Sequence, residues 1–313
     1  MLVMQSAVRR ILLVLSAGYI LMFFSEHVFW ARFRPGVDGP GNYLSTWIAY
    51  SLAGYAALAA ISLFRVRRAA AVFLAGAVFG WLAEGVIVGT TYESLPFSIS
   101  FTGLAWHALL SVWVGLWALP MLFSRRRLFL LPAAAAIGLF FGAWGINWNA
   151  NDAEYHASPP EFLLFAIVTT FLLILAYGVF LAARRSPVRI HPLEGVVLCL
   201  LAAFFFIFRA AVQPVALCVL PLLLGITFTA LAVNRHREPA GSLLEEPLPS
   251  FPASSLASLL LIPAAAAAVY VPAAALGLAL QTNILFYLLL MPPGFLFYFF
   301  SLWRIFQNSA RSP

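Results

Sequence analysis

Lysine is absent from this sequence of 313 residues, although arginine occurs 18 times. Without lysine the chain cannot form a retinal or pyridoxal Schiff base, and it has no P-loop lysine to hold a nucleotide phosphate. Cysteine is also scarce: Cys199 and Cys218 lie in successive apolar runs that place them too far apart to bridge. We therefore expect two free thiols in the core, and neither rhodopsin-like photochemistry nor direct nucleotide hydrolysis.

Charged side chains are rare as well. Only 9% of the residues are charged while 63% are hydrophobic, and the mean hydropathy is +0.96. This composition leaves too little polar surface to solvate a globule of this length. Because a membrane-spanning helix needs about 20 apolar residues, the composition predicts an all-α, polytopic integral membrane helical bundle of about ten transmembrane helices.

Ten apolar runs can be assigned to spans. The first, residues 11–30, follows Arg9 and Arg10 without a small-residue cleavage site, which indicates an uncleaved signal anchor. Residues 193–233 are too long for one helix, and Gln213 and Pro214 near their middle predict a tight hairpin between two spans. The other runs are residues 44–64, 69–91, 99–123, 128–148, 161–183, 255–280 and 283–303.

The arginines give the bundle an orientation. With a cytoplasmic N-terminus, only Arg32, Arg34 and Arg209 fall outside the cytoplasmic segments, which leaves 15 of the 18 arginines inside. The positive-inside rule then predicts that the N-terminus and the C-terminus are both cytoplasmic, in the cell membrane. The expected organisation is a bundle of about eight helices in residues 1–233, a cytoplasmic Pro/Ser/Glu-rich linker in 234–254, and two final spans with a cytoplasmic tail in 255–313.

Two ionisable residues, Glu84 and His107, lie inside predicted spans, where charge is costly and marks functional sites. Glu84 lies about seven residues before the outer end of its span and His107 about eight residues into the next, so both are roughly 10 to 12 Å deep. The short connector, residues 92–98, predicts antiparallel neighbours and a contact between the two side chains. The candidates for an outward-opening polar cavity between these spans are Trp81, Glu84, Trp106, His107, Asn147 and Arg209.

The same residues also have a structural explanation. The glycine pairs Gly76 with Gly80 and Gly138 with Gly142 have the spacing of closely packed helices. In such a bundle Glu84 and His107 could form one buried structural pair. Tryptophans near the span ends, such as Trp30, Trp47 and Trp148, fit an interfacial aromatic belt.

Metal binding is only weakly indicated. Asp152 and His156 lie four apart in an outer loop, but no HExxH, paired-cysteine or multi-histidine spacing accompanies them, and a solvated loop explains the same composition. The sequence has no GxSxG elbow and no glycine-rich phosphate loop, and it identifies no cofactor. Arginine clusters beside apolar runs indicate topology rather than nucleic-acid binding.

Three classes of function remain. The favoured one is a proton-coupled transporter of a small solute or lipid-linked molecule, in which a histidine exchanges a proton beside a buried carboxylate. The second is a membrane-embedded enzyme acting on lipid at the outer leaflet, with Glu84 or His107 as the catalytic general base. The third is a structural subunit of a membrane complex, because residues 161–313 carry few intramembrane polar groups. The expected partners are membrane lipids and a small-molecule or lipid substrate.

Overall fold

The computed structural model describes residues 2–125, 127–151, 156–238, 241–248 and 252–307. These residues form helices and connections, and no β-strand occurs among them. Ten of the described helices are long and apolar enough to cross a membrane. In chain order the spans are α1 (Leu2–Met22) with η1 (Phe23–His27) and α2 (Val28–Trp30), α3 (Pro40–Leu63), α4 (Ala69–Leu82) with η2 (Ala83–Val88), η4 (Ile99–Ala118) with α5 (Leu119–Arg125), α6 (Leu130–Asn151), α7 (Pro159–Ala183), α8 (Pro192–Val212), α9 (Ala216–Arg237), α10 (Ala253–Ala257) with η8 (Ser258–Leu260) and α11 (Leu261–Ala275), and α12 (Thr282–Gln307).

The hairpin predicted at Gln213 and Pro214 is present, because α8 ends at Val212 and α9 begins at Ala216. Helix α9 continues past the predicted end of its span to Arg237. Its last turn carries Arg235 and Arg237, whose positive charge suits the C-terminal end of a helix. The long apolar run is therefore two spans, as predicted.

The bundle has a buried centre and an exposed rim. In α4 with η2, 83% of the most apolar stretch is buried, against 11% in α8. Cys199 and Cys218 are free, as predicted, but both are exposed, so the prediction of core thiols is wrong. Cys199 is exposed because α8 turns most of its apolar side chains away from the protein.

Helices α4 and η4 lie so close that glycine is required at their contact. A methyl group on Gly80 would lie 2.2 Å from the carbonyl oxygen of Gly103, and one on Gly76 would lie 2.9 Å from that of Ala108. Small residues permit this approach of two backbones, as the spacing of Gly76 and Gly80 predicted. The next helix turn after Gly80 carries Glu84.

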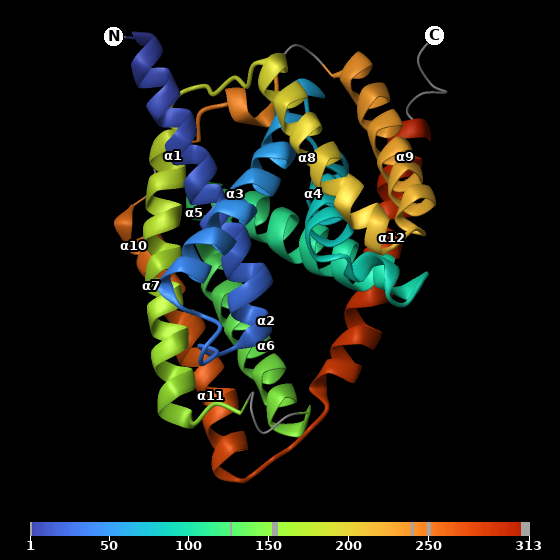
Figure 1. The fold of residues 1–313 in the computed structure, drawn as a ribbon. Coiled ribbons are helices and arrows are strands. Elements are labelled where there is room, and N and C mark those ends of the chain that lie inside the picture. Colours follow the sequence, from blue (N-terminus) through green and yellow to red (C-terminus); the bar gives the residue numbers. More distant parts are fainter. Residues whose placement is uncertain (1, 126, 152–155, 239–240, 249–251, 308–313) are drawn as a thin grey trace.

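The last helices belong to the same bundle. Gly138 and Gly142 on α6 lie against the carbonyls of Ile262 and Ala266 on α11, so this glycine pair packs α6 on α11. Helix α1 begins and α12 ends at the same end of the bundle (Figure 1), as an even number of spans requires.

The described part of the connection after α9 is fixed to neighbouring loops. The N–H of Leu243 donates to the carbonyl of Val66 at 2.8 Å, and Arg184 donates to the carbonyl of Glu246 at 3.1 Å. Leu244, next to Leu243, is buried. Burial also lowers the pKa of Arg184 to about 10. Residues 241–248 thereby join the loops at the arginine-rich end of the helices.

Candidate functional site

Three segments in the spans are π-helical, namely η1, η2 and η4. In a π-helix each N–H bonds to the carbonyl five residues earlier, as Gly89 does to Glu84 at 2.9 Å, and such turns are rare and frequent at functional sites. The residues that build the site lie mostly on these segments. Ser25, Glu26 and His27 are on η1, Glu84 is on η2, and His107 and Ser111 are on η4.

Glu84 and His107 are in direct contact, as their predicted depth and antiparallel helices led us to expect. Nε2 of His107 lies against Oε1 of Glu84, and the hydroxyl of Thr90 donates to Oε2 of the same carboxylate. The histidine is 3% exposed and the glutamate 8% exposed. A polar group buried away from water is costly without a partner, and here each side chain supplies one for the other.

Ser25 is the partner of the other histidine nitrogen. Its hydroxyl oxygen lies 2.9 Å from Nδ1 of His107 and 2.8 Å from the hydroxyl of Ser111. The chain order and spacing of Ser25 and His107 do not predict this contact, because the two residues lie on different helices and Glu84 lies on a third. A hydroxyl, an imidazole and a carboxylate are therefore aligned inside the bundle.

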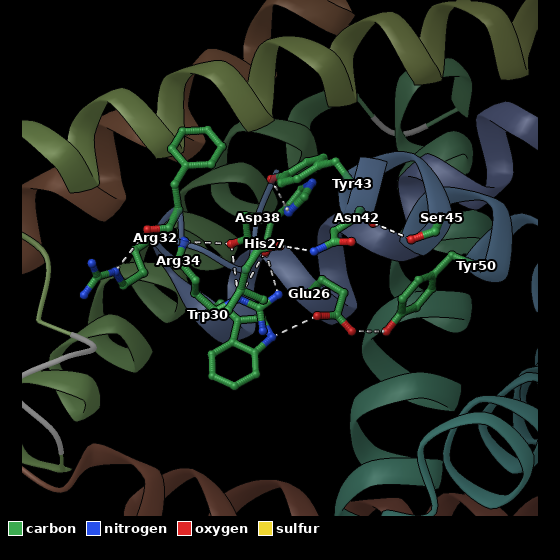
Figure 2. A network of polar contacts seen from close by, with 12 residues as sticks. Glu26, His27, Trp30, Arg32, Arg34, Asp38, Asn42, Tyr43, Ser45 and Tyr50 are labelled. Carbon is green, nitrogen blue, oxygen red and sulfur yellow. Dashed lines mark hydrogen bonds and ion pairs between the residues drawn. The ribbon is translucent and has the colours of Figure 1, made fainter. Parts of the chain in front are cut away.

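A second carboxylate, Glu26, joins the same group of side chains. Figure 2 shows it between Tyr50, whose hydroxyl donates to Oε1 at 2.8 Å, and Trp30, whose indole N–H donates to Oε2 at 2.9 Å. Ser25 and Glu26 are adjacent on η1, so one turn carries both the partner of His107 and the second carboxylate. We call this set the buried network: Glu26, Tyr50, Ser25, His107 and Glu84.

His27 lies beside the buried network and is almost fully buried. Its ring stacks on Tyr43 with the centroids 5.4 Å apart, and the Tyr43 hydroxyl lies 3.3 Å from Nδ1. Nε2 of His27 is buried and has no hydrogen-bond partner among the described residues. His27 also lines a chamber of about 20 Å³ together with Glu26, which is room for one water molecule.

The loop after the first span closes this chamber. The guanidinium of Arg34 makes an ion pair with Asp38 at 2.7 Å and lies 4.2 Å above the ring of Trp30 (Figure 2). Trp148 also stacks on Trp30, with the ring centroids 5.1 Å apart. Trp30 thus contacts the buried network through its hydrogen bond to Glu26. A position in an interfacial aromatic belt does not by itself explain this contact.

The indole groups of Trp81 and Trp106 bond to residues of other helices. The indole N–H of Trp81 donates to Thr227 at 3.2 Å, and that of Trp106 donates to the carbonyl of Phe24 at 3.0 Å. Asn147 is buried on α6. Trp106 holds the backbone of η1 and so helps to position Ser25, whereas Trp81 ties α4 to α9.

Arg209 binds the end of η2. It donates to the carbonyl of Val86 at 3.3 Å and to that of Ile87. The backbone turns away at Gly89, which has φ +95°, and a methyl group there would lie 2.5 Å from Nη1 of Arg209. Arg209 therefore fixes the segment that carries Glu84, and no hydrogen bond joins it to the carboxylate in the described structure.

The polar cavity expected between the third and fourth spans stays a prediction. At the level of Gly80 and Gly103 the two backbones are in close contact and leave no room for it. Of the two weak metal candidates, Asp152 lies outside the described residues and His156 is exposed. Within the described ranges, no three His, Cys, Asp or Glu side chains form a group that could hold a metal ion.

No protein-family model, curated protein or solved structure is detectably similar to this chain. The ten apolar helices make it a multi-pass membrane protein. Its function must therefore be inferred from the site itself.

Proposed function

We propose that this protein is a proton-coupled transporter of a small solute or a lipid-linked molecule in the cell membrane. The observation that carries the proposal is the contact between Glu84 and His107 within a network that continues to Glu26. A histidine beside a buried carboxylate changes its protonation when its surroundings change. A proton that passes between the two carboxylates would use the hydroxyls of Ser25, beside His107, and of Tyr50, beside Glu26.

The arginine distribution supports the orientation in the membrane that the proposal requires. With both termini in the cytoplasm, 15 of the 18 arginines lie on the cytoplasmic side, and the loop with Arg34 and Asp38 lies outside. The chamber beside Glu26 and His27 then faces the outer surface. A proton would enter by this chamber and reach Glu84 through the buried network.

The π-helical segments supply a way to couple protonation to movement. π-helical turns are frequent at functional sites, and a change from π-helical to α-helical hydrogen bonding would shift the register of a helix. Such a shift in η2 would move Glu84 away from His107 and break the buried network at its centre. A transporter needs two such arrangements, one open to each side of the membrane.

The test uses purified protein in liposomes that contain a pH-sensitive dye, with amino acids, sugars, nucleosides and short-chain lipids offered outside. We expect one class of solute to drive proton entry, and we expect this to be lost in Glu84→Gln and His107→Ala. The matched controls are Glu93→Gln and His236→Ala, at exposed positions. Unchanged solute and proton movement in both network variants, with all four proteins folded, would reject the proposal.

A second function is favoured by the order of Ser25, His107 and Glu84. A hydroxyl on one imidazole nitrogen and a carboxylate on the other is the arrangement of a nucleophile with its base and orienting acid. It would suit acyl transfer to or from a lipid at the outer leaflet. However, Ser25 is 5% exposed and its hydroxyl is already held by His107 and Ser111, which leaves little room for a reacting carbonyl.

A fluorophosphonate probe separates the two functions, because it modifies an activated serine covalently. We expect no modification of Ser25 in the membrane-embedded protein. Modification that disappears in Ser25→Ala, but persists when the exposed Ser45 is replaced by alanine, would establish the enzyme instead.

A further inference from the structure

An apolar groove of about 550 Å³ lies on the surface between α3, η2 and α8. Its lining side chains are apolar except for Ser45 and Arg209. Leu52, Phe205 and Phe208 line it and are exposed, so the groove opens sideways to the surrounding bilayer. Its contents are therefore expected to come from the membrane.

Arg209 lies at one end of this groove and has bonding capacity left. It donates to Val86, Ile87 and Gln213, and a guanidinium carries five N–H groups. No carboxylate of the described residues forms an ion pair with it. By contrast, the other end of the same helix carries Glu194, which pairs with Arg10 at 2.5 Å. A cation at a membrane boundary without a protein counter-ion attracts an anion.

The length of the groove also fits a lipid. Along α3 it runs from Ser45 to Ala56, which is roughly 16 Å at 1.5 Å per residue. This is about half of the roughly 30 Å hydrocarbon thickness of a bilayer, and thus one leaflet. Ser45 lies near the start of α3 and Arg209 near the end of α8, so both polar groups lie at the same end.

We propose that the groove binds an anionic phospholipid, with one acyl chain between α3 and α8 and the headgroup on Arg209. A headgroup that also carries an amine would bind less well. Its ammonium group would add a second positive charge beside Arg209, where no carboxylate of the described residues forms an ion pair. The acyl chain would contact Leu82 and Val86, which flank Glu84 in sequence, and Ala49, which precedes Tyr50. The lipid site rests on these contacts alone and stands whether or not the protein is a transporter.

The test is lipid retention by the intact protein, measured by mass spectrometry after release from nanodiscs that contain equal amounts of phosphatidylglycerol and phosphatidylcholine. We expect wild type to retain phosphatidylglycerol preferentially. Arg209→Gln should reduce that preference about fivefold, the equivalent of one arginine at a membrane surface. Ala202→Trp should reduce retention of both lipids, because Ala202 lines the groove.

The matched controls are Arg304→Gln on α12 and Ala268→Trp on α11, both at exposed positions away from the groove. Arg209→Lys keeps the charge and should restore the preference for phosphatidylglycerol, which separates lipid binding from the role of Arg209 in holding η2. Equal retention of the two lipids by wild type would overturn the proposal. So would an equal loss in Arg209→Gln and Arg304→Gln, because it would indicate unspecific surface lipid only.

Discussion

The hydroxyl of Ser25 and Nδ1 of His107 lie 2.9 Å apart, although 82 positions separate the two residues in the chain. Glu84 occupies the opposite nitrogen of the same ring. Because both nitrogens have partners, the proton on the imidazole decides which neighbour donates and which accepts. One histidine thus connects the first, third and fourth spans and can report a protonation change to all three.

Replacing Ser25 by alanine leaves a buried ring nitrogen without its partner. Such an unpaired group costs about 1–3 kcal/mol, so we expect a lower free energy of unfolding, measured by thermal unfolding in detergent. Ser16→Ala is the matched control, since the buried Ser16 hydroxyl bonds to carbonyls of its own helix, at 2.6 Å for Leu12. An equal loss of stability in the two variants would argue against a specific role for Ser25.

The contact of α4 with η4 predicts a strong effect of one added methyl group. In Gly80→Ala the new carbon would lie 2.2 Å from the carbonyl oxygen of Gly103, so the helices must separate. Overpacking of this kind costs about 1–3 kcal/mol. Gly225→Ala on α9 meets nothing within 4 Å and should be neutral or stabilise by up to about 1 kcal/mol. Thermal unfolding distinguishes them, and similar melting temperatures would contradict the packing described.

Tyr92 makes the stability of the folded protein decrease at alkaline pH. Burial raises its pKa from 10.0 to about 12, against the opposing effect of Arg209, and its hydroxyl donates to the carbonyl of Gly85 at 2.7 Å. The folded protein therefore holds this proton more tightly than the unfolded chain. The resulting stability is intact below the unfolded pKa and is lost as the pH rises toward about 12. In Tyr92→Phe the unfolding temperature should decrease less at alkaline pH than it does in wild type. An equal decrease in the two proteins would contradict this.

The proposed orientation can be tested by labelling single cysteines in a Cys199→Ala, Cys218→Ala background. Gln281→Cys lies in the connection between α11 and α12, and Arg235→Cys lies in the last turn of α9 at the opposite end. A membrane-impermeant maleimide should label the first in intact cells and the second only after permeabilisation. The reverse pattern would place both termini outside.

The spans and the meeting of Glu84 with His107 could be predicted because they depend on quantities that a sequence states directly. Apolar length defines a span, and counting residues from its ends gives depth. The short connector after Gly89 then makes the two helices neighbours. The hairpin at Pro214 could be predicted in the same way, from a run too long for one helix.

Ser25 and the role of Trp81 could not be predicted, because they depend on how helices rotate against each other. A π-helical segment turns its side chains by a different angle from an α-helix, so α-helical spacing misplaces residues such as Trp81 relative to Glu84. The closeness of Gly80 to Gly103 also depends on a glycine from another helix. At this contact the third and fourth spans pack directly on each other.

The most direct test of the central claim is the accumulation of the transported solute by liposomes that contain the Glu84→Gln variant. With an acidic outer solution, wild type should concentrate the solute inside, because proton entry drives it. The variant should still equilibrate the solute across the membrane but should not concentrate it. Accumulation by Glu84→Gln to the wild-type level would contradict the claim and leave Glu84 and His107 as a structural pair.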